Sequence, residues 1–155
     1  MTEPASRSLW ERLSGIQKID VRVDQLASGR AIASELTHAG LGKISVSQPC
    51  PTVLIFQESG HWIKGPTPIA FSNHVRWERI TRQKIQFTHL RYGTENPVNL
   101  VEFHRVSDLR WEGQRPYLCG DDCYSGRLSL SGNIVSLVWK ITGPAKNQRI
   151  TCNYS

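Results

Sequence analysis

Apolar and polar residues alternate along most of the chain with a period of two. In residues 134–142, one face carries the large apolar side chains of Val135, Leu137, Trp139 and Ile141. Turn-forming residues such as Gly, Pro, Asn, Asp and Ser interrupt the alternation about every ten residues, as at 131–133. This combination is typical of antiparallel β-hairpins. It predicts strands at 16–25, 30–37, 43–47, 52–59, 69–80, 83–91, 98–106, 122–130, 134–142 and 148–154.

The start of the chain follows a different period. Leu9, Trp10 and Leu13 are spaced as on one face of an α-helix, and Gly15 stands where such a helix can end. Residues 5–14 therefore predict one short amphipathic helix. No segment between predicted strands is long enough for repeated crossover helices, which disfavours a parallel sheet.

About ten antiparallel strands and one helix predict an all-β fold, a single up-and-down antiparallel β-barrel spanning 1–155. We expect the helix, within residues 1–15, to form a lid over one end of a barrel built from 16–155. A β-sandwich is the alternative, but closure of a barrel removes the exposed strand edges that a long meander leaves. A barrel of this size can hold one small ligand.

The composition is that of an ordinary globular domain. Hydrophobic residues make up 39% of the 155 residues and charged residues 21%. These values exclude intrinsic disorder, collagen and coiled coils. No apolar run reaches the length of a membrane span, and the N-terminus has no signal-peptide core. We therefore expect a cytoplasmic protein without a membrane partner.

The net charge of +6 permits an anionic partner. The local excess of basic residues lies between Arg76 and Arg91, with Glu78 opposing it. An anion or nucleic-acid binder using this stretch is a third hypothesis. No known nucleic-acid module accompanies the charge, so a solvated basic face is the favoured interpretation.

The cysteines and the familiar motifs give no sign of a metal or a cofactor. Cys119 and Cys123 are separated by three residues, and no histidine pair follows them at zinc-site spacing. Buried free thiols are the favoured interpretation of the four cysteines. The chain has no Gly-rich phosphate loop, G-x-S-x-G or H-E-x-x-H motif. We expect neither a metal nor a cofactor.

The strongest candidate chemistry lies in residues 117–126. Asp122 and Tyr124 share a strand face with Leu128, which argues that this face points inward. A partly desolvated Asp122 has a raised pKa and can exchange a proton with a ligand, with Tyr124 as donor. In the alternative interpretation, which we favour, the two side chains satisfy each other or an arginine. Lys146 follows a turn and can pair with Asp122 or with an anionic ligand, or simply be solvated.

A second group of polar and aromatic residues lies in 57–62 and 73–79. Glu58, His61 and Arg76 supply an acid, a base and a guanidinium, and His61 can act as a general base near neutral pH. For each of His61 and Arg76 a surface or structural role is the favoured alternative. Further on, Glu102 and His104 form either a proton relay or, as we favour, an outer salt bridge. The candidate ligand-lining residues are Trp77, Trp139, Glu58, Tyr117, Phe103 and Cys119. For the tryptophans, a place in the core is the favoured interpretation.

Two motifs in the second half of the chain are familiar. An H-x-C-G-x-D-x-Y pattern is matched by Cys119, Asp122 and Tyr124, with Tyr117 in place of the His. A W-x-V-x-G-P-x-K pattern is matched by Trp139, Ile141, Gly143, Pro144 and Lys146. The chain resembles the domain of unknown function 6314 family over nearly its whole length. This resemblance implies a lipocalin-like (calycin-like) barrel. It implies little about activity, because fold alone does not assign function.

Together these observations predict a barrel that binds a small, largely apolar or aromatic molecule. The balance leans slightly towards a cofactor-free enzyme, an isomerase or cyclase of a biosynthetic intermediate. In this hypothesis Asp122 or Tyr124 moves the proton, with Arg76, Lys146 and His61 assisting. The alternative is a non-catalytic carrier of a small hydrophobic ligand. The oligomeric state, including a homodimer, is left open.

Overall fold

The computed structural model describes residues 8–27, 30–31, 38–63 and 66–155. They form one short helix, α1 (Leu9–Ser14), and twelve strands. The strands are β1 (Lys18–Ala27), β2 (Arg30–Ala31), β3 (His38–Cys50), β4 (Val53–Ile63), β5 (Ile69–Thr81), β6 (Lys84–His89), β7 (Val98–Ser107), β8 (Arg110–Gly113), β9 (Tyr117–Cys119), β10 (Asp122–Ser131), β11 (Ile134–Thr142) and β12 (Asn147–Tyr154).

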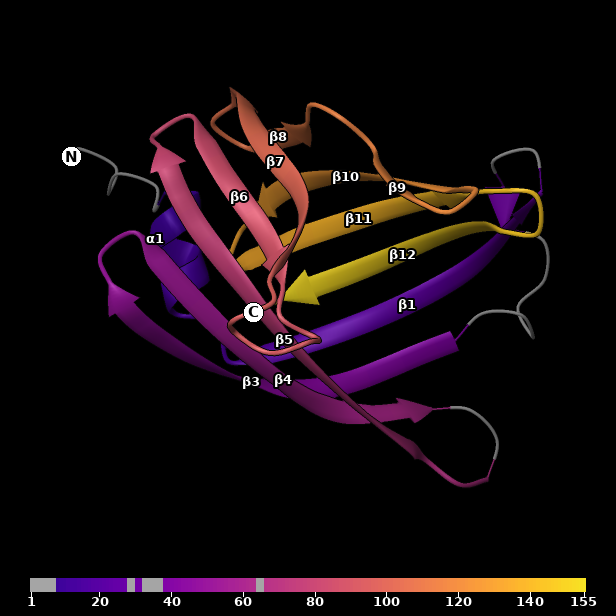
Figure 1. The fold of residues 1–155 in the computed structure, drawn as a ribbon. Helices are drawn as coiled ribbons and strands as arrows, with labels where there is room; N and C mark the ends of the chain where they lie inside the picture. The colour runs from indigo at the N-terminus through magenta and orange to yellow at the C-terminus, as the bar shows by residue number, and fades with distance from the viewer. Residues whose placement is uncertain (1–7, 28–29, 32–37, 64–65) are drawn as a thin grey trace.

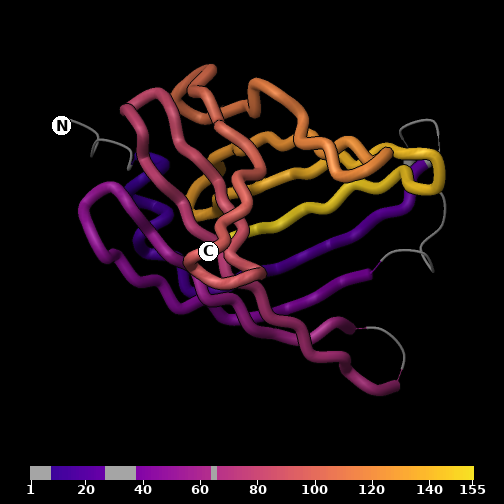
Figure 2. The backbone as a smooth tube through the Cα atoms, viewed as in Figure 1, coloured from indigo at the N-terminus to yellow at the C-terminus, as the bar shows by residue number. Residues whose placement is uncertain are grey.

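Ten of the strands in the described part of the chain close into one antiparallel barrel (Figure 1). Each strand of the ring pairs with its neighbours, and the order is β1-β3-β4-β5-β6-β7-β8-β10-β11-β12. β12 closes the ring by lying between β11 and β1 (Figure 2). Tyr154 is therefore paired with both Val135 and Ile19. The short strands β2 and β9 pair with β1 and β10 respectively. The predicted all-β barrel with a short N-terminal helix is confirmed.

Two glycines explain why β3 is longer than predicted. The sequence suggested a turn at 38–42, but β3 runs straight through it. Gly42 pairs with Gly60 of β4, and a Cβ at Gly42 would lie 2.6 Å from the Ser59 carbonyl oxygen. The glycines are therefore needed for close approach of two strands, not for a turn. Of the predicted strand 30–37, residues 32–37 lie outside the described residues.

The helix packs at one end of the barrel. Ser8 caps it by accepting a hydrogen bond from the Glu11 amide, and Leu9, Trp10 and Leu13 are buried. The Arg12 guanidinium donates to the Gly132 carbonyl in the β10–β11 turn. The β9–β10 and β11–β12 turns lie at the opposite end of the barrel (Figure 1).

An aromatic cluster fills the barrel. Trp77 is fully buried, and its ring lies 4.6 Å from Phe87 and 5.9 Å from Phe56, centroid to centroid. Tyr154 and Phe103 also contact Trp77, each at 6.3 Å. The Phe103 contact is stacked and the other three are tilted or edge-on, and aromatic contacts of these kinds add to the free energy gained from burial. The cluster forms the solid part of the core, and the remaining space in the barrel lies beyond it.

Candidate functional site

A cavity of about 350 Å³ lies inside the barrel. Ile141 and Ile150, which flank the β11–β12 turn, are part of its wall, so the cavity occupies the half of the barrel away from α1. Most of the lining is apolar, with contributions from Val75, Phe87, Leu100, Leu137 and Trp139. This size and this character suit a single small organic molecule.

On one side of the cavity, the neighbouring strands β7 and β9 are not joined by backbone hydrogen bonds, and their side chains form the wall. The β7–β8 ladder begins only at Phe103, and β9 pairs with β10. No ladder joins β7 to β9 in the described part of the chain. Leu100 of β7 and Tyr117 of β9 both line the cavity. This part of the wall can open by side-chain motion, without breaking backbone hydrogen bonds.

Glu58 is a buried carboxyl group in this cavity. It lies on the inward face of β4, two residues after Phe56, and is 2% exposed. Its Oε2 atom is buried and has no hydrogen-bond partner. Burial raises the pKa of Glu58 from 4.5 to about 7, and a hydrogen bond with the Asn73 side chain lowers it in part. Near neutral pH, the group is therefore present in both its protonated and its ionised form.

Cys152 and Tyr154 of β12 share the cavity with Glu58. Burial, together with the nearby Glu58, raises the pKa of the Cys152 thiol to about 12. Burial and Glu58 likewise raise the pKa of Tyr154 well above 10. The two side chains also form a hydrogen bond with each other. Both stay protonated near neutral pH, so Glu58 is the group of these three that can change charge.

Donor groups gather nearer the opening. His89 lines the cavity, and its Nδ1 accepts a hydrogen bond of 2.7 Å from the Arg91 amide, which leaves Nε2 to carry the proton. Burial and the charge of Arg91 lower the pKa of His89, so it remains neutral. Arg91 is exposed, lines the cavity and lies 5.9 Å from the ring centroid of Tyr92. Tyr117 and Tyr124 meet edge-on at 6.0 Å.

Several predicted site residues do line the cavity. They are Glu58, Tyr117, Cys119, Tyr124 and Trp139. The alternation of side chains along each strand places all five on the inward face or at the opening. The structure brings them together as the sequence suggested.

Asp122 and Lys146 pair with each other instead of lining the cavity. The Lys146 ammonium lies 3.6 Å from the Asp122 carboxylate, and both side chains are partly exposed. Asp122 lies against Gly143, where an added Cβ would overlap its Oδ1 atom. At the end of β10 the carboxylate therefore turns toward the β11–β12 turn. The predicted inward Asp122–Tyr124 pair is corrected to an Asp122–Lys146 ion pair beside the cavity.

His61 and Arg76 lie on the outer face of the barrel. Arg76 stands between the buried inward residues Val75 and Trp77 of β5, so its side chain points the other way. The same alternation turns His61 away from the face of β4 that carries Glu58. Because side chains alternate between the two faces of a strand, neither His61 nor Arg76 can point into the barrel beside Glu58. The suggested roles of His61 and Arg76 in the site therefore lack support from the geometry.

Trp77 and Phe103 belong to the solid core. Both are fully buried, and neither borders the cavity. They pack against each other at 6.3 Å, on the helix side of the cavity. Trp77 thus has the core position that was the favoured interpretation of the tryptophans. Phe103, a candidate for the ligand-binding surface, also lies in the core, because neighbouring aromatic rings fill the space that a ligand would need.

Six polar residues of the cavity wall were not predicted from the sequence. They are Asn73, His89, Arg91, Tyr92, Cys152 and Tyr154. Cys152 and Tyr154 alternate with Thr151 and Asn153 along β12, which was a readable signal for an inward face. Their closeness to Glu58 depends on closure of the barrel and has no local signal.

The basic residues of the 76–91 stretch do not form one surface. Arg79 lies 5.4 Å from the ring of Trp10 at the helix end, whereas Arg91 lies at the cavity. Lys84 lies 4.0 Å from Glu102, which also pairs with His104 at 2.8 Å. The Glu102–His104 contact therefore lies along β7 itself, and the cross-strand ion pair of Glu102 is with Lys84 of β6.

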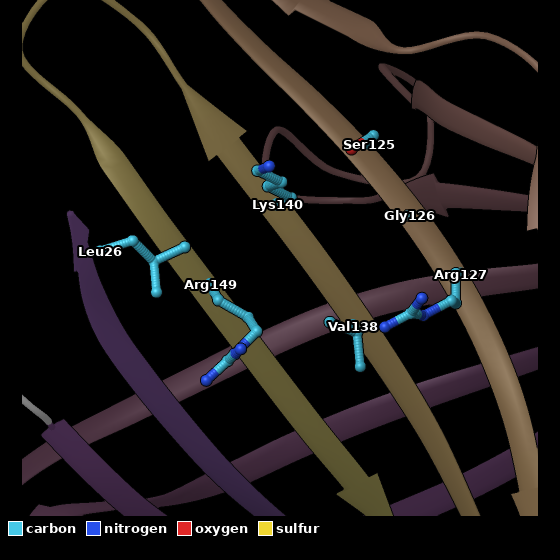
Figure 3. A pocket seen from close by; sticks show the side chains of 7 residues that line it. All are labelled: Leu26, Ser125, Gly126, Arg127, Val138, Lys140 and Arg149. Atoms are coloured by element: carbon cyan, nitrogen blue, oxygen red, sulfur yellow. The ribbon is translucent and has the colours of Figure 1, made fainter. Parts of the chain in front are cut away.

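A second hollow, of about 300 Å³, lies on the outer face of β10, β11 and β12 (Figure 3). Arg127, Lys140 and Arg149 surround Val138 there. Arg149 lies 3.4 Å from the buried carboxylate of Asp24, which Arg22 also contacts at 3.0 Å. One of the three basic side chains is thus already paired within the protein.

No helix in the described part of the chain is long and apolar enough to cross a membrane. Among the same residues, no group of three or more His, Cys, Asp and Glu side chains could hold a metal ion.

Comparison with known proteins places the chain among barrels. The family model described as "Family of unknown function (DUF6314)" matches residues 14–155. No curated protein matches the chain. The S-type phycobiliprotein lyase CPES from Guillardia theta has a similar fold, with a TM-score of 0.60 and 10% identity over 96% of this chain and 90% of that chain. A redesigned β-barrel, mFAP1, bound to DFHBI, matches with a TM-score of 0.45 and 11% identity over 97% and 99% of the two chains.

Proposed function

The chain belongs to the DUF6314 family of unknown function, and we propose that it binds a small organic molecule in its barrel and exchanges a proton with it through Glu58. The observation that carries this proposal is the buried Oε2 atom of Glu58, which faces the cavity without a partner. Unsatisfied buried polar atoms are rare in folded proteins because each costs about 1–3 kcal/mol. A bound molecule that donates a hydrogen bond to Oε2 would remove this cost.

The cavity wall favours an apolar or aromatic molecule. Trp139, Leu137 and Ile141 present apolar surface, and Trp139 can hold a flat ring system by contact with its own ring. Such a wall also excludes water, which strengthens any hydrogen bond formed to Glu58.

The reaction that fits best is a cofactor-free isomerisation or cyclisation. A carboxyl group with a pKa near 7 can both accept and return a proton near neutral pH, which is the requirement for general acid–base catalysis. The apolar wall would hold the substrate in one conformation and so lower the entropic part of the barrier. Tyr124, at the opening, can donate a hydrogen bond to an oxygen on which negative charge develops. The similar barrel from Guillardia theta is a lyase, so this fold is compatible with an enzyme.

The second candidate function is that of a carrier. Cys152 and Tyr154 stay protonated near neutral pH, which leaves Glu58 without a second titrating partner at the buried end of the cavity. A single carboxyl group can hold the donor of a ligand without changing it chemically.

Mass spectrometry of the purified protein tests both functions. We expect a small molecule to co-purify with the wild type and with Asp122→Asn, and to be lost from Glu58→Gln. On incubation of the loaded wild type in D₂O, an acid–base enzyme incorporates deuterium at carbon in the bound molecule. The same molecule, extracted and added in excess to Glu58→Gln, should stay unlabelled. Retention without exchange at carbon in the wild type would support the carrier. If no molecule co-purifies and an apolar dye such as 1-anilinonaphthalene binds the wild type and a cavity-blocked Leu137→Trp variant equally, the proposal is wrong.

A further inference from the structure

We infer that the bound molecule is polarised: it carries an N–H or similar donor at its buried end and an anionic group at the end near the opening. This inference rests on the proposed function and names the class of ligand. The Glu58 carboxylate would accept a hydrogen bond from the donor of the ligand, and the Arg91 guanidinium would contact its anionic group.

The buried end of the cavity offers an acceptor. Glu58 is 2% exposed, and its Oε2 atom has no partner. The other two polar groups at this end, the Cys152 thiol and the Tyr154 hydroxyl, already form a hydrogen bond with each other. A purely apolar ligand would leave Oε2 unsatisfied in a dry site, at a free-energy cost. A ligand with a hydrogen-bond donor at this end gives the Oε2 atom of Glu58 the partner that it lacks among the described residues.

The outer end of the cavity offers donors and positive charge. Arg91 lines the cavity, and no carboxylate in the described part of the chain forms an ion pair with it. His89 presents Nε2–H, because its Nδ1 accepts the Arg91 amide. The carboxylate beside the opening, Asp122, is neutralised by Lys146. An anionic group fits here because a guanidinium and a ring N–H can both donate to it.

The positions of Glu58 and Arg91 in the cavity determine where the ligand must carry its donor and its anionic group. Glu58 is buried on β4 and pairs with Asn73 of β5, whereas Arg91 is exposed and follows β6, on the other side of β5. Apolar side chains such as Phe87, Leu100 and Trp139 occupy the wall between and around these groups. The complementary ligand is a flat apolar body that carries its donor on the side toward Glu58 and its anion on the side toward Arg91.

Four naphthalene probes test this polarity at pH 8, where Glu58 is mostly ionised. The probes are naphthalene, 2-aminonaphthalene, 2-naphthoic acid and 6-amino-2-naphthoic acid, and displacement of bound 1-anilinonaphthalene reports their affinity. We expect the wild type to bind the amino acid probe at least about tenfold more tightly than naphthalene, a difference of about 1.4 kcal/mol. Glu58→Gln should remove the advantage of the amino group. Arg91→Gln should remove the advantage of the carboxylate.

Arg82→Gln is the matched control, because Arg82 lies in the β5–β6 turn, away from the cavity. It removes the same charge and should leave all four affinities unchanged. Equal affinity of the wild type for all four probes would overturn the polarity and leave the proposed function standing. Absence of binding by every probe, and of the dye itself, would overturn both. A carboxylate advantage that Arg82→Gln removes as well would show general charge attraction and also overturn the inference.

Discussion

Glu58 faces Asn73 directly across the β4–β5 ladder, and the two differ sharply in environment. The carboxyl group is buried, whereas Asn73 is exposed and donates a hydrogen bond that partly offsets the effect of burial on the pKa of Glu58. The pair therefore marks the boundary between solvent and the dry interior. The protonation of Glu58 therefore depends both on its burial and on its hydrogen bond with Asn73.

Stability should fall as the pH rises through the range in which Glu58 ionises. The folded protein holds this proton more tightly than the unfolded chain, with a pKa of about 7 against 4.5. The contribution of Glu58 to stability is complete below pH 4.5, is lost between pH 4.5 and 7, and stays lost above pH 7. The loss amounts to about 3 kcal/mol. Urea unfolding of the wild type and Glu58→Gln at pH 5 and pH 8 measures it. Between pH 5 and pH 8, the free energy of unfolding should fall by about this amount more in the wild type than in Glu58→Gln. An equal fall in both proteins would contradict the prediction.

The cysteines should differ in reactivity. Cys50 is exposed, and hydrogen bonds with Thr52 lower its pKa, whereas burial raises the pKa of Cys152 to about 12. Only a thiolate attacks iodoacetamide readily. In native protein at pH 8, peptide mass spectrometry should find Cys50 labelled early and Cys152 unlabelled until the protein is unfolded. Cys119 is exposed at the cavity, so a bound ligand should slow its labelling and leave that of Cys50 unchanged.

Replacement of glycine by alanine should destabilise the protein at Gly60 but not at Gly15. A Cβ at Gly60 would overlap the carbonyl oxygen of Leu41 and lie 2.6 Å from the Gly42 Cα, so the two strands would have to separate. Gly60→Ala should lower the free energy of unfolding by about 2 kcal/mol or more. Gly15→Ala is the control, since the nearest atom to its Cβ would be the Arg12 oxygen at 3.9 Å. Thermal unfolding of both variants gives the comparison, and similar losses would show that the close approach of β3 and β4 is unimportant.

The helix should be needed for stability. Leu13 is fully buried between α1 and the barrel, and its truncation leaves a cavity that neighbouring side chains fill only in part. Leu13→Ala should lower the free energy of unfolding by about 2–5 kcal/mol. Its exposed neighbour Ser14 offers the control, and Ser14→Ala should change it by about 0.5 kcal/mol or less. If denaturant titrations give equal values for the two variants, the helix is not part of the cooperative unit.

The sequence was most informative where one periodicity dominated. The strand 134–142 and the turn after Ser131 could be predicted closely, because the alternation of apolar residues is strict and a glycine with positive φ fits the turn. The glycines of β3 were misread because a glycine in a strand and a glycine in a turn look alike in sequence. Their true requirement, close approach of the paired strand β4 at Gly60, depends on the strand register and has no signal in the glycines themselves.

The same limit applies to the site. Alternation along β4 puts Glu58 on the same face as the buried Phe56, and this relationship follows from the sequence without tertiary information. The contacts of Glu58 with Cys152 and of Asp122 with Lys146 depend on barrel closure and on a turn conformation. Local patterns identify the direction of a side chain, but they do not identify its partner on another strand.

The place of β12 between β1 and β11 also bears on how quickly the barrel forms. Pairing Ile19 with Tyr154 joins two segments from opposite ends of the chain, and this contact requires a very long loop to close first. Proteins rich in such distant contacts fold slowly. We expect the β10–β11–β12 hairpins, whose partners are adjacent in sequence, to form early and the seam between β1 and β12 to form last. Until that seam forms, β1 and β12 both expose unpaired edges, and the chain is most prone to associate with other copies of itself.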